Sequence, residues 1–157
     1  MGVQPIPEGY HSLTPYLAVE DASKAIEFYK EAFGAEETVR MPGSDGKIAH
    51  AELQIGDSKL MLSDPMPQSS VRPPSERGGT TASIFMYVDD ADATFDQATA
   101  AGADVVMQLE DMFWGDRFGT LSDPFGHVWS IATHKEDLSE EEMAERSKAA
   151  MAEMGAG

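Results

Sequence analysis

Cysteine is absent from this chain, which excludes disulfide bonds, thiolate zinc sites and cysteine nucleophiles. Long hydrophobic runs are missing as well. No apolar stretch reaches membrane-spanning length, and the N-terminus lacks the basic-then-apolar pattern of a secretion signal. We therefore expect a soluble cytoplasmic protein with no membrane partner.

Basic residues are scarce. The 157 residues include 11 lysines and arginines against 28 aspartates and glutamates, so the formal net charge is −17. A chain of that charge is a poor match to a phosphate backbone, and we expect no nucleic-acid partner. The sequence also lacks a Gly-x-Ser-x-Gly elbow and a glycine-rich phosphate loop, so serine hydrolysis and phosphate-loop chemistry have no support.

An internal repeat is the main positive signal. The segment Val19–Gly34 contains a strand end, an aspartate that can cap a helix, a helical pattern and a terminating glycine, and the segment Val88–Gly102 repeats this order. Three predicted strands follow each helix. Two copies are too few for a solenoid, so we predict two fused βαββ modules of the α+β class, forming one curved, cup-like mixed sheet with helices outside. The predicted division is an N-terminal arm (1–10), a first module (11–65), a linker (66–80), a second module (81–135) and a C-terminal acidic helix (136–157).

Alternation along the predicted strands separates two sheet faces. One face is aliphatic and can be covered by a helix; for the first strand we assign Leu13, Leu17 and Val19 to it. The other face mixes rings with polar groups, which suits the wall of a concave pocket, because aromatic side chains on an open face would form an uncovered apolar patch. A solvent-facing sheet surface is the alternative. The residues predicted on this second face are Thr14, Tyr16, His50, Glu52, Ser83, Phe85, Tyr87 and Ser130.

Two pairs of residues carry candidate chemistry. His50 and Glu52 lie two apart on one strand and face the same way, so they form either a catalytic base or ligand pair in the cup, or a polar pair at its rim. A metal site that adds His134 to this pair is a further possibility. In the loop before the last hairpin, Trp114 could stack on a planar ligand and Arg117 could hold a carboxylate or phosphate. The alternative is structural: Arg117 would pair with Asp116 or Asp123, and Trp114 would close the sheet edge.

The repeat, the start Thr14–Val19 and the closing segment Asp123–Trp129 (Asp-Pro-Phe-Gly-His-Val-Trp) resemble the vicinal oxygen chelate superfamily. That superfamily includes glyoxalase I, bleomycin-resistance proteins, fosfomycin-resistance enzymes and ring-cleaving dioxygenases. The segments 25–29, 33–35 and 114–117 resemble its glyoxalase-like, PhnB-like branch most. The resemblance covers roughly residues 11–134 and implies the cup-shaped fold.

The same resemblance bears on metals and partners. In metal-dependent members, histidine or glutamate ligands enter the cup from the first and last strands of each module. The matching positions here are Thr14, about Met61, Ser83 and Ser130, and none of these is a good ligand for the family's divalent metals. The resemblance therefore implies a cup without a metal or other cofactor. Relatives commonly dimerise, sometimes by exchanging modules, so we expect a homodimer.

Three functions are compatible with these residues. The first is binding of a small aromatic or anionic molecule in a metal-free cup lined by Thr14, Tyr16, Ser83, Phe85, Tyr87, Trp114, Arg117 and Ser130. The second is a lyase or isomerase of the superfamily's type, with His50 and Glu52 as base or metal ligands. The third is a PhnB-like accessory protein without catalysis, which predicts no pocket wide enough for a ligand.

Overall fold

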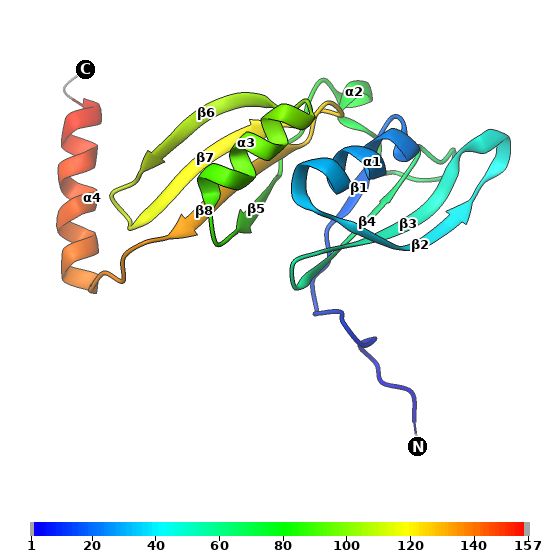
Figure 1. Cartoon of the computed structure of the whole chain (residues 1–157), viewed down its shortest axis with the longest axis horizontal. Coiled ribbons are helices and arrows are strands. Elements are labelled where there is room, and N and C mark those ends of the chain that lie inside the picture. The colour runs from blue at the N-terminus through cyan, green and yellow to red at the C-terminus, as the bar shows by residue number, and fades with distance from the viewer. Residues whose placement is uncertain (1, 156–157) are drawn as a thin grey trace.

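The two predicted modules are present in the computed structural model, which describes residues 2–155. Each module consists of one strand, one helix and three further strands, so the α+β class and the duplicated architecture are confirmed (Figure 1). The first module comprises β1 (Tyr16–Ala18), α1 (Ala22–Phe33), β2 (Glu36–Pro42), β3 (Ile48–Ile55) and β4 (Ser58–Ser63), with a short 3₁₀ turn, η1 (Ser44–Gly46), between β2 and β3. The second comprises β5 (Ser83–Tyr87), α3 (Ala91–Ala101), β6 (Asp104–Asp111), β7 (Asp116–Ser122) and β8 (Val128–His134).

Each module forms its own four-stranded sheet. The strand orders are β1-β4-β3-β2 and β5-β8-β7-β6, and in both sheets the first strand pairs in parallel with the last while the other pairs are antiparallel. The registers correspond: Tyr16 lies beside Met61 in the first sheet, as Phe85 lies beside Ser130 in the second. The two sheets are not closed on each other, so a single chain does not enclose a complete cup.

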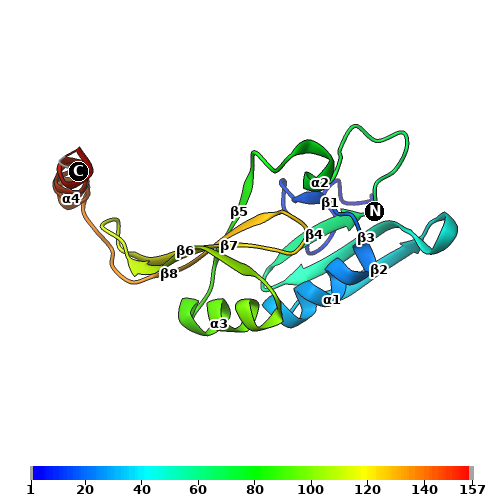
Figure 2. The ribbon, with the colours of Figure 1, turned by 90° about the horizontal axis from the view of Figure 1, so that it is seen from above.

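The helices of the two modules, α1 and α3, cover one face of the sheets. Asp21 accepts a hydrogen bond from the Lys24 backbone N–H at the start of α1, and Asp90 caps α3 in the same way through the Ala93 N–H. Figure 2 shows α1 and α3 along the same side of the molecule, so neither of these two helices covers the opposite sheet faces.

The aliphatic strand faces form the core beneath these helices, as the sequence predicts. Leu17, Val19, Leu53 and Ile131 are buried. Leu13 was assigned to the same face, and that prediction is wrong, because β1 begins only at Tyr16 and the Leu13 side chain is 91% exposed.

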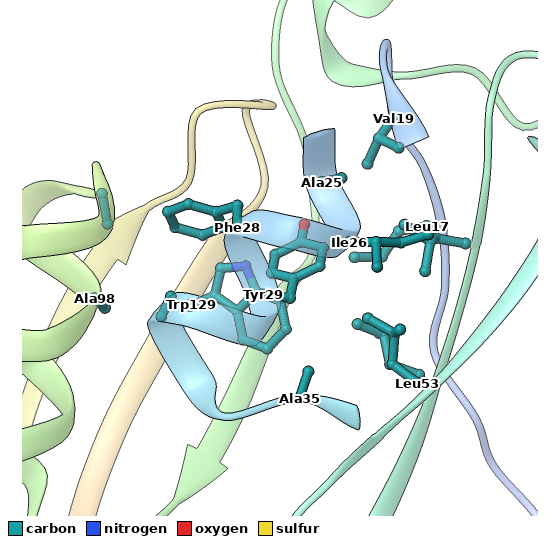
Figure 3. Close-up of a cluster of buried hydrophobic side chains, with 14 of the residues drawn as sticks. Leu17, Val19, Ala25, Ile26, Phe28, Tyr29, Ala35, Leu53, Ala98 and Trp129 are labelled. Carbon is teal, nitrogen blue, oxygen red and sulfur yellow. The ribbon is translucent and has the colours of Figure 1, made fainter. Parts of the chain in front are cut away.

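Asp123 joins the two modules inside this core. Its Oδ2 accepts hydrogen bonds from the Tyr29 hydroxyl of α1 (2.6 Å) and from the Trp129 indole of β8 (2.9 Å), and its Oδ1 accepts the backbone N–H groups of Phe125 and His127. Figure 3 shows Tyr29 packed beside Trp129, and their ring centroids are 5.3 Å apart. Burial and the neighbouring carboxylate hold the pKa of Tyr29 well above its usual value, so the phenol remains a donor.

Two segments lie outside the modules, the predicted linker and the C-terminal helix. The predicted linker contains a short helix, α2 (Pro74–Arg77), that the sequence pattern did not indicate. The C-terminal helix α4 (Glu140–Gly155) forms as expected, with a reciprocal cap between Ser139 and Glu142, and residues 156–157 of the predicted segment lie outside the described residues. Across residues 2–155, no helix has the length and apolar character needed to cross a membrane.

The Tyr29–Asp123 bond gives a test of the core. Replacing Tyr29 with Phe leaves a buried carboxylate oxygen with one donor fewer, so we expect the free energy of unfolding to fall by about 1–2 kcal/mol. Urea unfolding followed by circular dichroism measures this change. Tyr16→Phe is the matched control, because it removes an exposed hydroxyl hydrogen bond and should cost clearly less. Equal losses in the two variants would contradict the proposed role of Asp123.

Candidate functional site

The sheet faces opposite the helices carry exposed rings. Tyr16, Phe85 and Tyr87 are 45%, 48% and 61% exposed, although phenylalanine is among the residue types most often buried and tyrosine is intermediate. In the first module the ring of Tyr16 lies 5.5 Å from that of His50, and in the second Phe85 lies 5.6 Å from Phe118. Phe118 was not named: Trp114 and Arg117 were assigned to a loop from the sequence, whereas β7 already begins at Asp116. The strand register would have found it, since Phe118 occupies in the second sheet the place of His50 in the first.

In the first module, four polar side chains form a hydrogen-bonded chain. The Tyr16 hydroxyl contacts His50 Nδ1 (2.9 Å), His50 Nε2 contacts Glu52 Oε1 (3.0 Å), and Glu52 Oε2 accepts a hydrogen bond from the Tyr10 hydroxyl. His50 and Glu52 therefore share a face, as the sequence predicts. Tyr10 comes from the segment expected to be a loose arm and was not anticipated.

The protonation states follow from the partners. Hydrogen bonds from Tyr10 and His50 lower the pKa of Glu52, so it is a carboxylate that only accepts. Burial and the bond to Glu52 raise the pKa of Tyr10 to about 12. Because a carboxylate only accepts, Nε2 of His50 donates to Glu52, and Nδ1 faces the hydroxyl of Tyr16.

In the second module, a buried carboxylate organises the polar groups. Asp116 is 3% exposed; its Oδ2 accepts from the Tyr87 hydroxyl (2.8 Å) and the Trp114 indole (3.1 Å), and its Oδ1 contacts Nδ1 of His134 (2.8 Å). His134 Nε2 reaches Asp137 at 2.7 Å. The sequence named Trp114 and Tyr87 but did not place Asp116 between them.

These contacts set the charges of the second cluster. Burial alone would raise the pKa of Asp116, but hydrogen bonds from His134, Tyr87 and Trp114 outweigh burial and lower it. Hydrogen bonds to Asp116 and then Asp137 raise the pKa of His134. Since both partners of His134 are acceptors, the ring donates from both nitrogens as an imidazolium. The Trp114 indole N–H donates to Asp116, and the centroid of its ring lies 5.5 Å from that of Phe118 in an edge-on arrangement.

Arg117 has partners that the sequence did not suggest. Its Nε and Nη2 donate to Asp92 at 2.7 and 2.9 Å, and its Nη1 donates to Asp111 at 3.3 Å, whereas the structural alternative drawn from the sequence named Asp116 or Asp123. These two carboxylates raise the already high pKa of the guanidinium further. A fork that is engaged in this way has little capacity left for a ligand anion.

Two grooves flank the edge strands β1 and β5. Each has a volume of about 840 Å³. Thr14, Phe85 and Tyr87 line the first, and Tyr16, Ser83 and Phe85 line the second, so Phe85 is common to both. The remaining candidate residues line neither groove: His50, Glu52, Trp114, Arg117 and the buried Ser130. The roles of all these residues in binding or catalysis stay predictions.

The positions that hold metal in metal-dependent relatives do not fit a divalent ion. These positions offer hydroxyls and a thioether, where such ions need imidazole or carboxylate. Thr14 precedes β1, Met61 lies beside Tyr16, Ser83 begins β5 and Ser130 is buried. In the part of the chain that the structure describes, no three histidine, aspartate or glutamate side chains converge as a metal site. His134 binds Asp116 and Asp137 and does not join His50 and Glu52.

Comparisons with known proteins agree with this geometry. Residues 10–131 match the family model of the Glyoxalase/Bleomycin resistance protein/Dioxygenase superfamily. The Mycobacterium bovis protein Mb0911c is 44% identical over 149 residues, covering 93% of this chain and 95% of that protein. Among solved structures, TioX from Micromonospora sp. ML1 has a TM-score of 0.64 and 32% identity, covering 79% of this chain and 98% of TioX. TnmS3, an antibiotic binding protein from Streptomyces sp. CB03234, has a TM-score of 0.63 and 25% identity, covering 85% of this chain and all (100%) of TnmS3.

The duplicated modules, the matching strand order and the extent of these similarities lead to one conclusion. The chain belongs to the Glyoxalase/Bleomycin resistance protein/Dioxygenase superfamily, the vicinal oxygen chelate family that its sequence resembles.

Proposed function

We propose that the protein binds a small aromatic molecule on the ring-lined faces beside β1 and β5. The observation that carries this proposal is the exposure of Tyr16, Phe85 and Tyr87 next to grooves of about 840 Å³, a volume in the range of small-molecule sites. Burying these rings against a ligand would release the water that now covers them. The similarity to TnmS3, described as an antibiotic binding protein, supports the same function.

We further propose a homodimer in which the ring-lined faces of two copies are brought together. The two sheets of one chain leave these faces uncovered, and a face of the first module lying opposite a face of the partner's second module would give two equal cups. The C-terminal helix supports association, because α4 has no buried residue and exposes Met151 and Met154 at 57% and 74%. The cytoplasmic location expected from the sequence stays a prediction.

The hydrogen-bonded chain of the first module favours a second candidate function, a lyase or isomerase. Nδ1 of His50 would take a proton from an activated C–H, and the imidazolium formed would be stabilised by the Glu52 carboxylate on Nε2. Returning that proton to another carbon would complete an isomerisation. The grooves weigh against the third hypothesis, a purely accessory role, which predicted no pocket wide enough for a ligand.

Binding can be tested with the neutral fluorescent probe N-phenyl-1-naphthylamine. We expect saturable binding that weakens about five- to tenfold in Phe85→Ala, because Phe85 borders both grooves and a ring contact contributes about 0.5–1.5 kcal/mol beyond its buried area. Val106→Ala is the control, since it truncates an exposed apolar side chain on β6 that lines neither groove. Equal affinity in both variants would place the probe elsewhere and contradict the proposal.

Catalysis can be tested with a benzyl ketone that has an activated C–H, 1-phenyl-2-propanone, by proton NMR in D₂O. If His50 is a base, protein-dependent exchange of that hydrogen should fall about 100-fold or more in His50→Gln. Glu52→Gln should lower the rate less, because it only removes the orienting carboxylate. If the wild type does not exceed the rate without protein, the catalytic hypothesis fails while simple binding is unaffected.

The dimer can be tested by sedimentation equilibrium. We expect a mass of twice the 17.0 kDa of one chain. Phe85→Asp should shift the equilibrium toward the monomer by placing a charge on a face that would be covered, whereas Val106→Asp should not. A specific dimer is expected to form well below a protein concentration of about 100 µM. A wild-type mass of one chain at that concentration would exclude the proposed assembly.

A further inference from the structure

The second groove has an unusual charge for this protein. Although the chain has 28 acidic and 11 basic residues, the described residues that line this groove include two arginines, Arg72 and Arg77, and neither aspartate nor glutamate. The first groove, by contrast, contains Asp57 and Asp89 beside Lys59. A chain of net charge −17 repels anions in general, so an anion meets less repulsion in the second groove, which has no carboxylate in its lining, than in the first.

The two arginines of the groove are in different states. Arg72 is neutralised: its Nε and Nη2 donate to both carboxylate oxygens of Glu76 at 2.6 and 3.0 Å, and its Nη1 donates to the Met66 carbonyl. Arg77 has no ion pair or side-chain hydrogen bond among residues 2–155, and the neighbouring Glu76 is already engaged by Arg72. Its guanidinium is therefore available for a bidentate contact with an anion.

The segment that carries Arg77 is held in place. Arg77 is the last residue of α2, which ends at Gly78 in the left-handed conformation. Pro74 of α2 is buried against the turn before β8; a β-carbon on Gly126 of that turn would come within 2.8 Å of the Pro74 ring. Arg77 is thus presented to the groove from a packed segment, although the sequence suggested only a linker there.

The rest of the groove suits an aromatic ring. Tyr16 of β1 and Phe85 of β5 both line it, and about half of each side chain is exposed. In the described sheets β1 pairs only with β4, and β5 only with β8, so each presents one unpaired backbone edge. The lining residues Ser83 and His127 add polar groups.

We propose that this groove binds an aromatic anion, with Arg77 holding the carboxylate, sulfonate or phosphate while Tyr16 and Phe85 contact the ring. This inference rests on the proposed binding function and gives its ligand a chemical class. It also moves the anion contact from Arg117, the residue suggested by the sequence, to Arg77, because Arg117 is engaged by Asp92 and Asp111.

A pair of probes separates ring binding from anion recognition. 1-Anilinonaphthalene-8-sulfonate and N-phenyl-1-naphthylamine share their rings, but only the first carries a negative charge. By fluorescence titration at 0.15 M salt, we expect Arg77→Gln to weaken binding of the sulfonate about tenfold and to leave the neutral probe unchanged. Arg77→Lys, which keeps the charge without the fork, should lose less. Lys24→Gln is the control for net charge, because the Lys24 side chain is 80% exposed on α1, outside the groove.

The outcomes are distinguishable. If both probes bind and Arg77→Gln affects neither, or affects both equally, anion recognition by Arg77 is wrong while the aromatic binding function stands. If neither probe binds the wild type, the proposed function fails and the inference with it. If Arg117→Gln removes the preference for the sulfonate and Arg77→Gln does not, the anion contact belongs to Arg117 and the inference is overturned.

Discussion

The structure depends on one buried carboxylate that two modules share. Asp123 accepts four hydrogen bonds, from Tyr29 of the first module and from Phe125, His127 and Trp129 of the second. A buried charge is costly unless donors surround it, so the turn, the indole and the phenol must all be in place together. This requirement fixes α1 against β8, and it thereby fixes which sheet faces remain uncovered and where the edges of β1 and β5 lie.

Because acidic residues outnumber basic ones, the partners of each arginine indicate whether it can bind a ligand anion. Arg40, Arg72, Arg117 and Arg146 each contact a carboxylate within 3.3 Å. In a chain of net charge −17, an arginine ordinarily finds a carboxylate partner. Of the two arginines that line the second groove, Arg72 pairs with Glu76, whereas Arg77 has no carboxylate partner among the described residues.

The sequence predicted the duplicated fold because local patterns determine it: aspartate caps, terminal glycines and alternating strands repeat in both modules. It did not predict which distant partners meet. Arg117 lies next to Asp116 in the chain, yet a strand sends neighbouring side chains to opposite faces, so Arg117 meets Asp92 of α3 while Asp116 meets Tyr87 and His134. The prediction that Leu13 lies in the core was wrong for another reason: alternation cannot show where a strand begins, and β1 begins only at Tyr16.

The register of the two sheets shows how the halves have diverged. The equivalent positions on the exposed faces are Tyr16 and Phe85, His50 and Phe118, Glu52 and Thr120, and Met61 and Ser130. The first module thus presents a polar, hydrogen-bonded wall, and the second presents stacked rings. In the proposed dimer, a cup that combines one wall of each kind would be asymmetric, so it could hold a bound aromatic ring in one orientation. Two identical walls could not impose that orientation, which is a physical reason for a duplicated fold to retain different residues in its two halves.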